Sequence, residues 1–142
     1  MPTVAPLDID GHVLAVEFLG DTPFFASAAG AIHRLEGGDK VTEAHRGMLT
    51  CIRDPHSDSL ISGGEDGKVL RIAADGSVTV LADVPRKWIG QIAAGPQGAV
   101  AYSYGKSTFV RLSDGTTKEF PEERTVEGIA FAPKGLRIAV AR

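Results

Sequence analysis

Hydrophobic and polar residues alternate along most of the chain, and short polar turns that contain glycine interrupt the alternation. The stretch ISGGEDGKVLRIAADGSVTVL, residues 61–81, shows this pattern, with turns at Asp66-Gly67 and Asp75-Gly76. A period of two is typical of β-strands that bury one face. Asp-Gly is typical of β-hairpin turns, because both central residues of the tightest turns need positive φ. No segment shows a helical period, so the pattern predicts an all-β chain of short antiparallel strands.

Two landmarks recur along the chain with nearly the same spacing. One is a strand with an arginine followed by Leu or Ile and by a glycine-containing turn, and the other is a strand that ends in proline. The arginines are Arg34, Arg71 and Arg111, at spacings of 37 and 40 residues, and the prolines are Pro55, Pro96 and Pro133, at spacings of 41 and 37 residues. Four antiparallel strands in a repeat of about 40 residues are the arrangement of a β-propeller blade, which buries its faces by packing on neighbouring blades. We expect the three arginines to be structural, with their stems packed on apolar neighbours.

The second repeat, HRGMLTCIRDPHSDSLISGGEDGKVLRI, contains His, Pro, Ser-Gly and Asp-Gly in that order. In this order of residues it resembles a blade of the WD-repeat β-propeller family. The resemblance implies that His45, Ser62 and Asp66 form a polar network that ties the blade together. The chain departs from the family in lacking the Trp-Asp dipeptide, and the turn aspartate is Ala29 in the first repeat and Lys106 in the third.

The repeats divide the chain into about three and a half blades. We predict full blades over residues 11–44, 45–84 and 85–122, the first half of a fourth over 123–142, and a closing strand over 1–10. Known propellers have about four to eight blades, and an unpaired sheet edge is a template for association. We therefore expect the rest of the propeller to come from a second chain, from a longer parent chain or from self-association.

The composition narrows the possible binding partners and the cellular compartment of the protein. A net charge of −3 over 142 residues gives no sign of a nucleic-acid-binding protein. Cys51 is the only cysteine, so a disulfide framework is excluded and a reducing compartment is favoured. The first residues do not resemble a signal peptide, and no apolar run approaches the roughly 18 residues of a membrane span. We expect a cytoplasmic protein that binds neither nucleic acid nor membrane.

Motifs for catalysis are absent or lie in the wrong context. Gly105-Lys106-Ser107 ends like a phosphate-binding loop, but Val100 stands where its first glycine should be and a strand follows. No serine lies in a Gly-x-Ser-x-Gly elbow, and no histidine lies at zinc-ligand spacing. Cys51 sits in an apolar strand, which predicts a buried, inert thiol. We expect no catalytic residue, cofactor or metal; the alternative is a hydrolase or lactonase of propeller type whose active site further blades complete.

One recurring feature points to a binding surface. Nine residues before each of the three prolines stands a basic residue, namely Arg46, Lys87 and Arg124, and Trp88 follows Lys87. The same offset in successive blades places these residues on one face. An aromatic residue beside cations is typical of interaction hot spots. We expect a non-enzymatic scaffold that binds a protein or peptide there, an anionic peptide being the ligand such cations favour. The alternative is local neutralisation by the carboxylates just upstream, Glu43, Asp83, Glu122 and Glu123.

Overall fold

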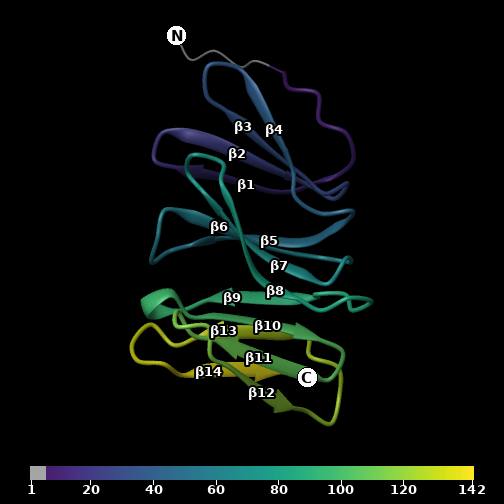
Figure 1. Ribbon diagram of the computed structural model, residues 1–142, viewed down its shortest axis with the longest axis vertical. Helices are drawn as coiled ribbons and strands as arrows, with labels where there is room; N and C mark the ends of the chain where they lie inside the picture. The colour runs from purple at the N-terminus through teal and green to yellow at the C-terminus, as the bar shows by residue number, and fades with distance from the viewer. Residues whose placement is uncertain (1–5) are drawn as a thin grey trace.

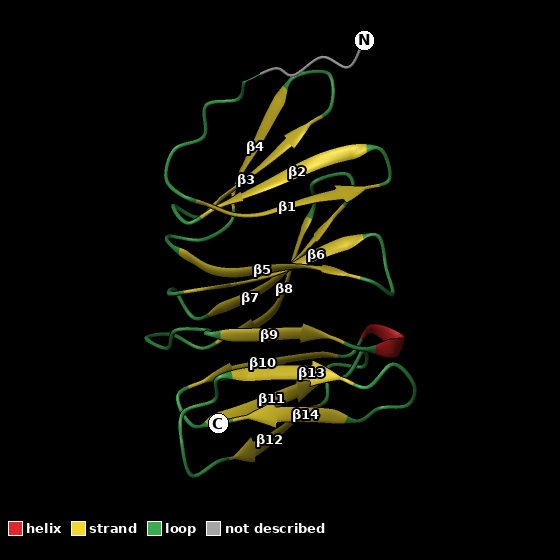
Figure 2. Ribbon diagram, turned by 180° about the vertical axis from the view of Figure 1, so that it is seen from behind, coloured by secondary structure: helices red, strands yellow, loops and turns green. Residues whose placement is uncertain are grey.

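The computed structural model describes residues 6–142 and contains three four-stranded antiparallel sheets and one two-stranded sheet (Figures 1 and 2). The first sheet consists of β1 (Val13–Leu19), β2 (Thr22–Ser27), β3 (Ala31–Leu35) and β4 (Asp39–Glu43). The second consists of β5 (Met48–Asp54), β6 (Ser59–Gly64), β7 (Lys68–Ala73) and β8 (Val78–Asp83). The third consists of β9 (Gln91–Ala94), β10 (Val100–Tyr104), β11 (Ser107–Arg111) and β12 (Thr117–Pro121). The fourth is the hairpin of β13 (Gly128–Phe131) and β14 (Ile138–Ala141). The single helical element among the described residues is a 3-10 turn at Pro96–Gly98.

Each sheet is a simple meander in which neighbouring strands follow one another along the chain. The turns between strands depend on glycine where the sequence predicted it. Gly67 and Gly76 adopt φ angles of 81° and 89°, in the left-handed region that glycine reaches without steric cost. The alternating pattern and these turns together produce hairpins with strands of four to seven residues.

The sheets are stacked one after another, and their first strands lie next to each other. The strand β1 contacts β5, β5 contacts β9, and β9 contacts β13. Figure 1 shows the first three sheets in succession along the long axis of the molecule. Such radial packing of meander sheets through their first, innermost strands is the arrangement of propeller blades.

Three hydrophobic clusters fill the junctions between the blades. At the first junction, Leu19, Phe24, Ala26 and Ile32 pack against Met48, Leu60, Leu70 and Ile72. At the second, Ile61 and Val69 pack against Ile89, Ile92, Val100 and Tyr102. At the third, Ala93, Ala101 and Val110 pack against Ile129, Phe131 and Ile138. Each blade therefore buries its faces only with the help of its neighbours.

The two ends of the chain differ from the middle of the stack. The closing strand predicted over residues 1–10 falls partly on residues 1–5, which lie outside the described residues. Residues 6–12 contain no strand. Beside the fourth hairpin, a groove of about 620 Å³ remains open, lined mainly by apolar residues that include Val110, Phe120, Leu136 and Ile138. Over residues 6–142, the structure has no helix long and apolar enough to cross a membrane.

Candidate functional site

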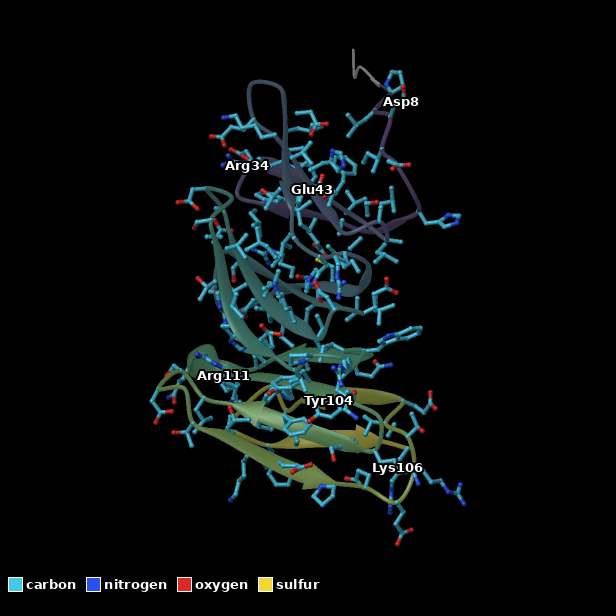
Figure 3. All side chains as sticks on the ribbon, turned by 45° about the vertical axis from the view of Figure 1, so that its right-hand side comes forward. Asp8, Arg34, Glu43, Tyr104, Lys106 and Arg111 are labelled. Carbon is cyan, nitrogen blue, oxygen red and sulfur yellow. The ribbon has the colours of Figure 1, made fainter. Side chains whose placement is uncertain are left out.

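One end of the blade stack gathers the loops that link successive blades. We call this end the loop face and define it by residues 28–30, 44–47, 65–67, 84–90, 105–106 and 122–127. Within each blade the turn between the second and third strands is bonded to the loop that leaves the blade. The backbone N–H of Val84 donates to the carbonyl of Gly67 at 2.8 Å, and that of Glu122 donates to the carbonyl of Lys106 at 2.7 Å. Figure 3 shows Lys106 at one edge of the molecule, whereas Arg34 and Arg111 lie at the opposite edge.

The four residues predicted to contact a partner all lie on the loop face. Arg46 is in the loop between β4 and β5, Lys87 and Trp88 are in the loop between β8 and β9, and Arg124 is in the loop between β12 and β13. All four are exposed, and Trp88 has 66% of its surface accessible. A tryptophan this exposed is unusual, because its large apolar surface is normally buried.

The cations of this set are not neutralised by ion pairs with the carboxylates near them. Among residues 6–142, none of Arg46, Lys87 and Arg124 forms an ion pair. Glu122 and Glu123 instead pair with Arg142, at 3.4 and 3.7 Å.

The loop of Lys87 and Trp88 has two further features. The Lys87 ammonium lies over the Tyr104 ring, 5.7 Å from its centroid, which is within the range of a cation–π contact. Arg86, next to Lys87, has a φ of 67°, an uncommon conformation for a residue other than glycine. Such backbone strain is found preferentially in functional loops.

A shallow pocket of about 490 Å³ opens on the loop face at the junction of the first two blades. Its lining includes Arg46 and Lys68 together with Glu43, His45 and Asp66. Arg46 is thus at the rim of a hollow large enough to receive a side chain of a bound partner.

His45, Ser62 and Asp66 form a continuous chain of hydrogen bonds beneath this pocket. The imidazole Nδ1 lies 2.9 Å from Asp66 Oδ1, and Nε2 lies 2.8 Å from Ser62 Oγ. Because a carboxylate only accepts, Nδ1–H of His45 donates to Asp66. The backbone N–H of Lys68 also donates to Asp66 Oδ1, at 3.2 Å. The network joins the blade-linking loop to the second and third strands of the second blade.

The environment of Asp66 keeps its carboxyl group ionised. Burial raises the pKa of this group, but hydrogen bonds from His45 and from the Lys68 backbone, with the charge of His45, outweigh that effect and lower the pKa below its ordinary value. The chain of bonds has the connectivity of a Ser-His-Asp catalytic triad. However, Ser62 is 0% exposed and the His45 side chain is equally buried, so the hydroxyl does not meet solvent or a substrate. The bonds connect the loop at His45 with β6 and with the turn before β7.

A second buried polar network was not identified from the sequence. Asp54, 0% exposed at the end of β5, accepts hydrogen bonds from Arg71 Nη1 at 2.8 Å, from the His56 backbone N–H at 2.8 Å and from Ser57 Oγ at 3.0 Å. Burial raises the pKa of Asp54, and these donors outweigh it, so the pKa lies below its usual value. The guanidinium of Arg71 thus links β7 to the end of β5. The recurrence of its arginine and the Asp-Pro turn were the signals available in the sequence.

The described residues contain no group of three or more His, Cys, Asp or Glu side chains placed to hold a metal ion.

Comparisons with solved structures place this arrangement of sheets in the β-propeller fold. The chain is similar to the computationally designed protein Ika4, with a TM-score of 0.71 and 15% identity, over 99% of this chain and 98% of Ika4. It is also similar to the C-terminal WD40 domain of Sif2, with a TM-score of 0.76 and 15% identity, over 95% of this chain and 44% of Sif2. Streptogramin B lyase matches with a TM-score of 0.71 and 15% identity, over 95% of this chain and 50% of the lyase. The chain thus spans about half the length of these last two structures. No protein-family model matches the chain, and no curated protein sequence matches it.

At this level of identity the likeness establishes the fold alone. It confirms the predicted all-β propeller of four-stranded antiparallel blades with about three and a half blades present. The structural neighbours of the chain include both WD40 domains and an enzyme, so they do not indicate one function.

Proposed function

We propose that the protein is a non-enzymatic interaction scaffold of WD-repeat type that binds an acidic protein segment or peptide across its loop face. The observation that carries the proposal is the set Arg46, Lys87 and Arg124, which stand at equivalent positions in successive blade-linking loops without carboxylate partners. The His45 network supports the WD-type assignment, since it is the blade-stabilising arrangement that the resemblance implied.

The chemistry of the surface favours a particular kind of ligand. Three cations spread over three loops suit carboxylates spaced along an extended chain better than a single compact anion. Trp88 adds apolar surface beside Lys87, so an acidic peptide with an interspersed apolar residue matches the surface. Aromatic side chains that become buried in this way contribute much of the binding energy at protein interfaces. Charge complementarity mainly sets specificity and the association rate.

A direct test uses a fluorescein-labelled oligoglutamate peptide that contains one central leucine, with an oligolysine counterpart as the negative probe. The combined variant Arg46→Ala, Lys87→Ala and Arg124→Ala should bind the acidic peptide at least about tenfold more weakly than the unmodified chain. The matched control is Lys40→Ala, Lys118→Ala and Lys134→Ala, which removes the same charge from exposed positions outside the loop face. Fluorescence anisotropy at low and physiological salt measures both affinities. Equal weakening by the two variants, or no binding by the unmodified chain, would refute the proposal.

Trp88 provides an independent readout, because it is the only tryptophan of the chain. If the peptide covers the loop between β8 and β9, the emission of Trp88 should shift to shorter wavelength on binding. Binding without any change in this emission would place the peptide elsewhere on the molecule.

A hydrolase or lactonase remains the second candidate, because streptogramin B lyase shares the fold. Its active site would require groups from further blades. Ester and lactone hydrolysis by the purified protein, with and without added divalent metals, separates this candidate from a scaffold.

A further inference from the structure

Within residues 6–142, two sheet faces at the ends of the blade stack have no neighbouring blade. We call the outer face of the first blade the leading face, and define it by Leu14, Val16 and Phe18 of β1 with Pro23 and Phe25 of β2. Val16 and Phe18 have exposed fractions of 52% and 59%, and Leu14 is also exposed. In the register of the sheet, Val16 lies opposite Phe25 and Phe18 lies opposite Pro23, so these residues share one face. The inner half of this blade therefore presents bulky apolar side chains.

The opposite end of the stack presents small side chains instead. We call the outer face of the fourth hairpin the trailing face, and define it by Gly128 and Ala130 of β13 with Ala139 and Ala141 of β14. Ala130 lies opposite Ala139, and Gly128 lies opposite Ala141. The bulky residues of these strands, including Ile129 and Phe131, point the other way and pack on the third blade. The trailing face is also hollowed, with a cavity of about 370 Å³ whose lining includes Ala130, Ala132 and Ala139.

The junction between the third and fourth blades already joins a face of small side chains to a face of bulky apolar side chains. There Ala93 and Ala101, which lie opposite each other in the register, are buried beneath Ile129 and Phe131. Ala93 stands three residues before Pro96, and Ala130 stands three residues before Pro133, so the two alanines are equivalent. Ala101 and Ala139 are their respective cross-strand partners.

The leading face carries bulky apolar side chains like those that the fourth blade contributes to that junction. In the fourth blade, Phe131 forms the last register pair of its hairpin and Ile129 lies two residues earlier. In the first blade, the register shift between Val13 and Ala15 matches that between Met48 and Thr50, which aligns Val16 and Phe18 with residues four and two positions before Pro55. Ile129 and Phe131 stand four and two positions before Pro133. Val16 and Phe18 are thus equivalent in position to Ile129 and Phe131, and their side chains are similar in size and polarity. The exposed trailing face is the kind of surface on which such a pair packs.

We propose that the leading face of one copy of this chain packs on the trailing face of a second copy, head to tail. The hairpin of β13 and β14 has two strands, so it covers the inner half of the partner's first blade, where Val16 and Phe18 lie. Val41 of β4, on the same face and 50% exposed, lies in the outer half that the hairpin does not cover. Each copy supplies four blade positions. Two copies joined by two such contacts provide eight positions, within the range of about four to eight blades of known propellers. Head-to-tail contacts close into a ring when the rotation between copies permits it. This proposal is independent of the loop face.

The native mass of the whole chain, measured by light scattering over a wide range of concentration, tests the proposal. We expect a mass of twice 14.9 kDa. Val16→Glu should reduce the mass to that of one chain, because it places a charge in the apolar contact. Ala139→Glu should do the same from the other side. The matched control is Val80→Glu, which changes an equally exposed valine, at 53%, on the outermost strand of the second blade and should leave the mass at two copies.

Mixing the two disruptive variants distinguishes a head-to-tail contact from a symmetric one. A mixed pair of Val16→Glu and Ala139→Glu chains contains one contact in which both faces are unmodified. We therefore expect a weaker dimer to reappear on mixing, whereas each variant alone stays monomeric. Circular dichroism confirms that both variants are folded. A monomeric unmodified chain at high concentration, or a Val16→Glu variant that associates like the unmodified chain, would overturn the proposal.

Discussion

Asp54 and Asp66 are held as carboxylates by the donors that surround them, Asp54 in the interior of the second blade and Asp66 in the turn between β6 and β7. Asp54 receives three hydrogen bonds, of which the one from Arg71 carries a positive charge. Charge-assisted bonds of this kind are stronger than neutral ones. A buried charge that keeps all its donors is tolerated, but the loss of one partner leaves an unpaired charge in an apolar setting.

The pH dependence of stability follows from these two carboxylates. Their pKa values in the folded protein lie below the ordinary 3.8, so their ionised forms stabilise the folded state at pH values above about 3.8. This contribution is lost as the pH falls through the lowered pKa values. Urea unfolding at a series of pH values should therefore show a falling free energy of unfolding on the acid side.

Asp54→Asn isolates one of the two groups. The variant loses the charge-assisted bond from Arg71, so it should be less stable at neutral pH by about 1–3 kcal/mol. As the pH falls, its free energy of unfolding should also decrease less steeply than that of the unmodified protein. Asp58→Asn, an exposed position in the same turn, is the control and should change neither quantity. Identical behaviour of the two variants would contradict the role assigned to Asp54.

Cys51 should be chemically inert in the folded protein. Burial, followed by the charge of Glu17 on the neighbouring blade, raises the pKa of its thiol to about 12. Since the thiolate is the nucleophile, only about one molecule in 10⁴ is reactive at about pH 8. Alkylation by iodoacetamide, followed by intact-mass spectrometry, should be slow under native conditions and rapid in denaturant. Fast native alkylation would show that the first two blades separate readily.

At the residue scale, the polar network of His45 could be predicted from the sequence, whereas the network of Asp54 could not. His45, Ser62 and Asp66 could be grouped because they resemble a known blade pattern, and the structure brings them into one chain of bonds. Asp54 and Arg71 are 17 residues apart on different strands. The recurring arginine and the Asp-Pro turn mark the two residues separately, and only the register of β5, β6 and β7 shows that they meet.

The first two blades are each fastened to the outgoing loop by a glycine turn, at Gly30 and at Gly67, where a Cβ atom would collide with the loop backbone. Gly67 has a φ of 81°, and a Cβ atom there would collide with the backbone carbonyl of Val84. That carbonyl belongs to the loop whose own N–H donates to Gly67. The hairpin turn and the loop that carries Lys87 and Trp88 are consequently packed backbone to backbone.

Gly67→Ala should destabilise the protein more than an alanine at a similar but open turn. Gly115 has a φ of 90°, and a Cβ there would meet nothing within 4 Å. Gly115→Ala should therefore cost only the left-handed backbone penalty of about 1–2 kcal/mol. Gly67→Ala adds the collision with Val84 and should shift the midpoint of urea unfolding further. Equal midpoints for both variants would mean that the loop moves aside without cost.

At the element scale, periodicity and turn chemistry were sufficient to predict strands and hairpins but not their neighbours. The Asp-Gly turns and the repeat of about 40 residues fix which strands pair within a blade. The sequence also indicated that the residues before each proline-ended strand share a face, as Arg46, Lys87 and Arg124 do. It could not indicate that Glu122 and Glu123 pair with Arg142 rather than with Arg124, because that choice depends on the path of the last strand.

On the scale of the whole molecule, each blade is stabilised by its junctions with the neighbouring blades. The second and third blades each have a neighbour on both sides, whereas the first blade and the fourth hairpin have one. In such quasi-one-dimensional stacks the terminal units are the least stable. The sequence shows the repeat but does not show what packs against the end faces.

Hydrogen exchange should reveal this gradient directly. Amides of β6, β7, β9 and β10 should exchange most slowly, and those of β13 and β14 fastest, because a two-stranded hairpin is marginal without support. Raising the protein concentration should slow exchange in residues 13–19 and 128–141 if the end faces meet in a second copy. Residues 59–73, inside the stack, should not respond to concentration, which makes them the internal reference. Uniform exchange along the chain would show instead that the stack unfolds as one unit, and that its end faces need no partner to be as stable as its centre.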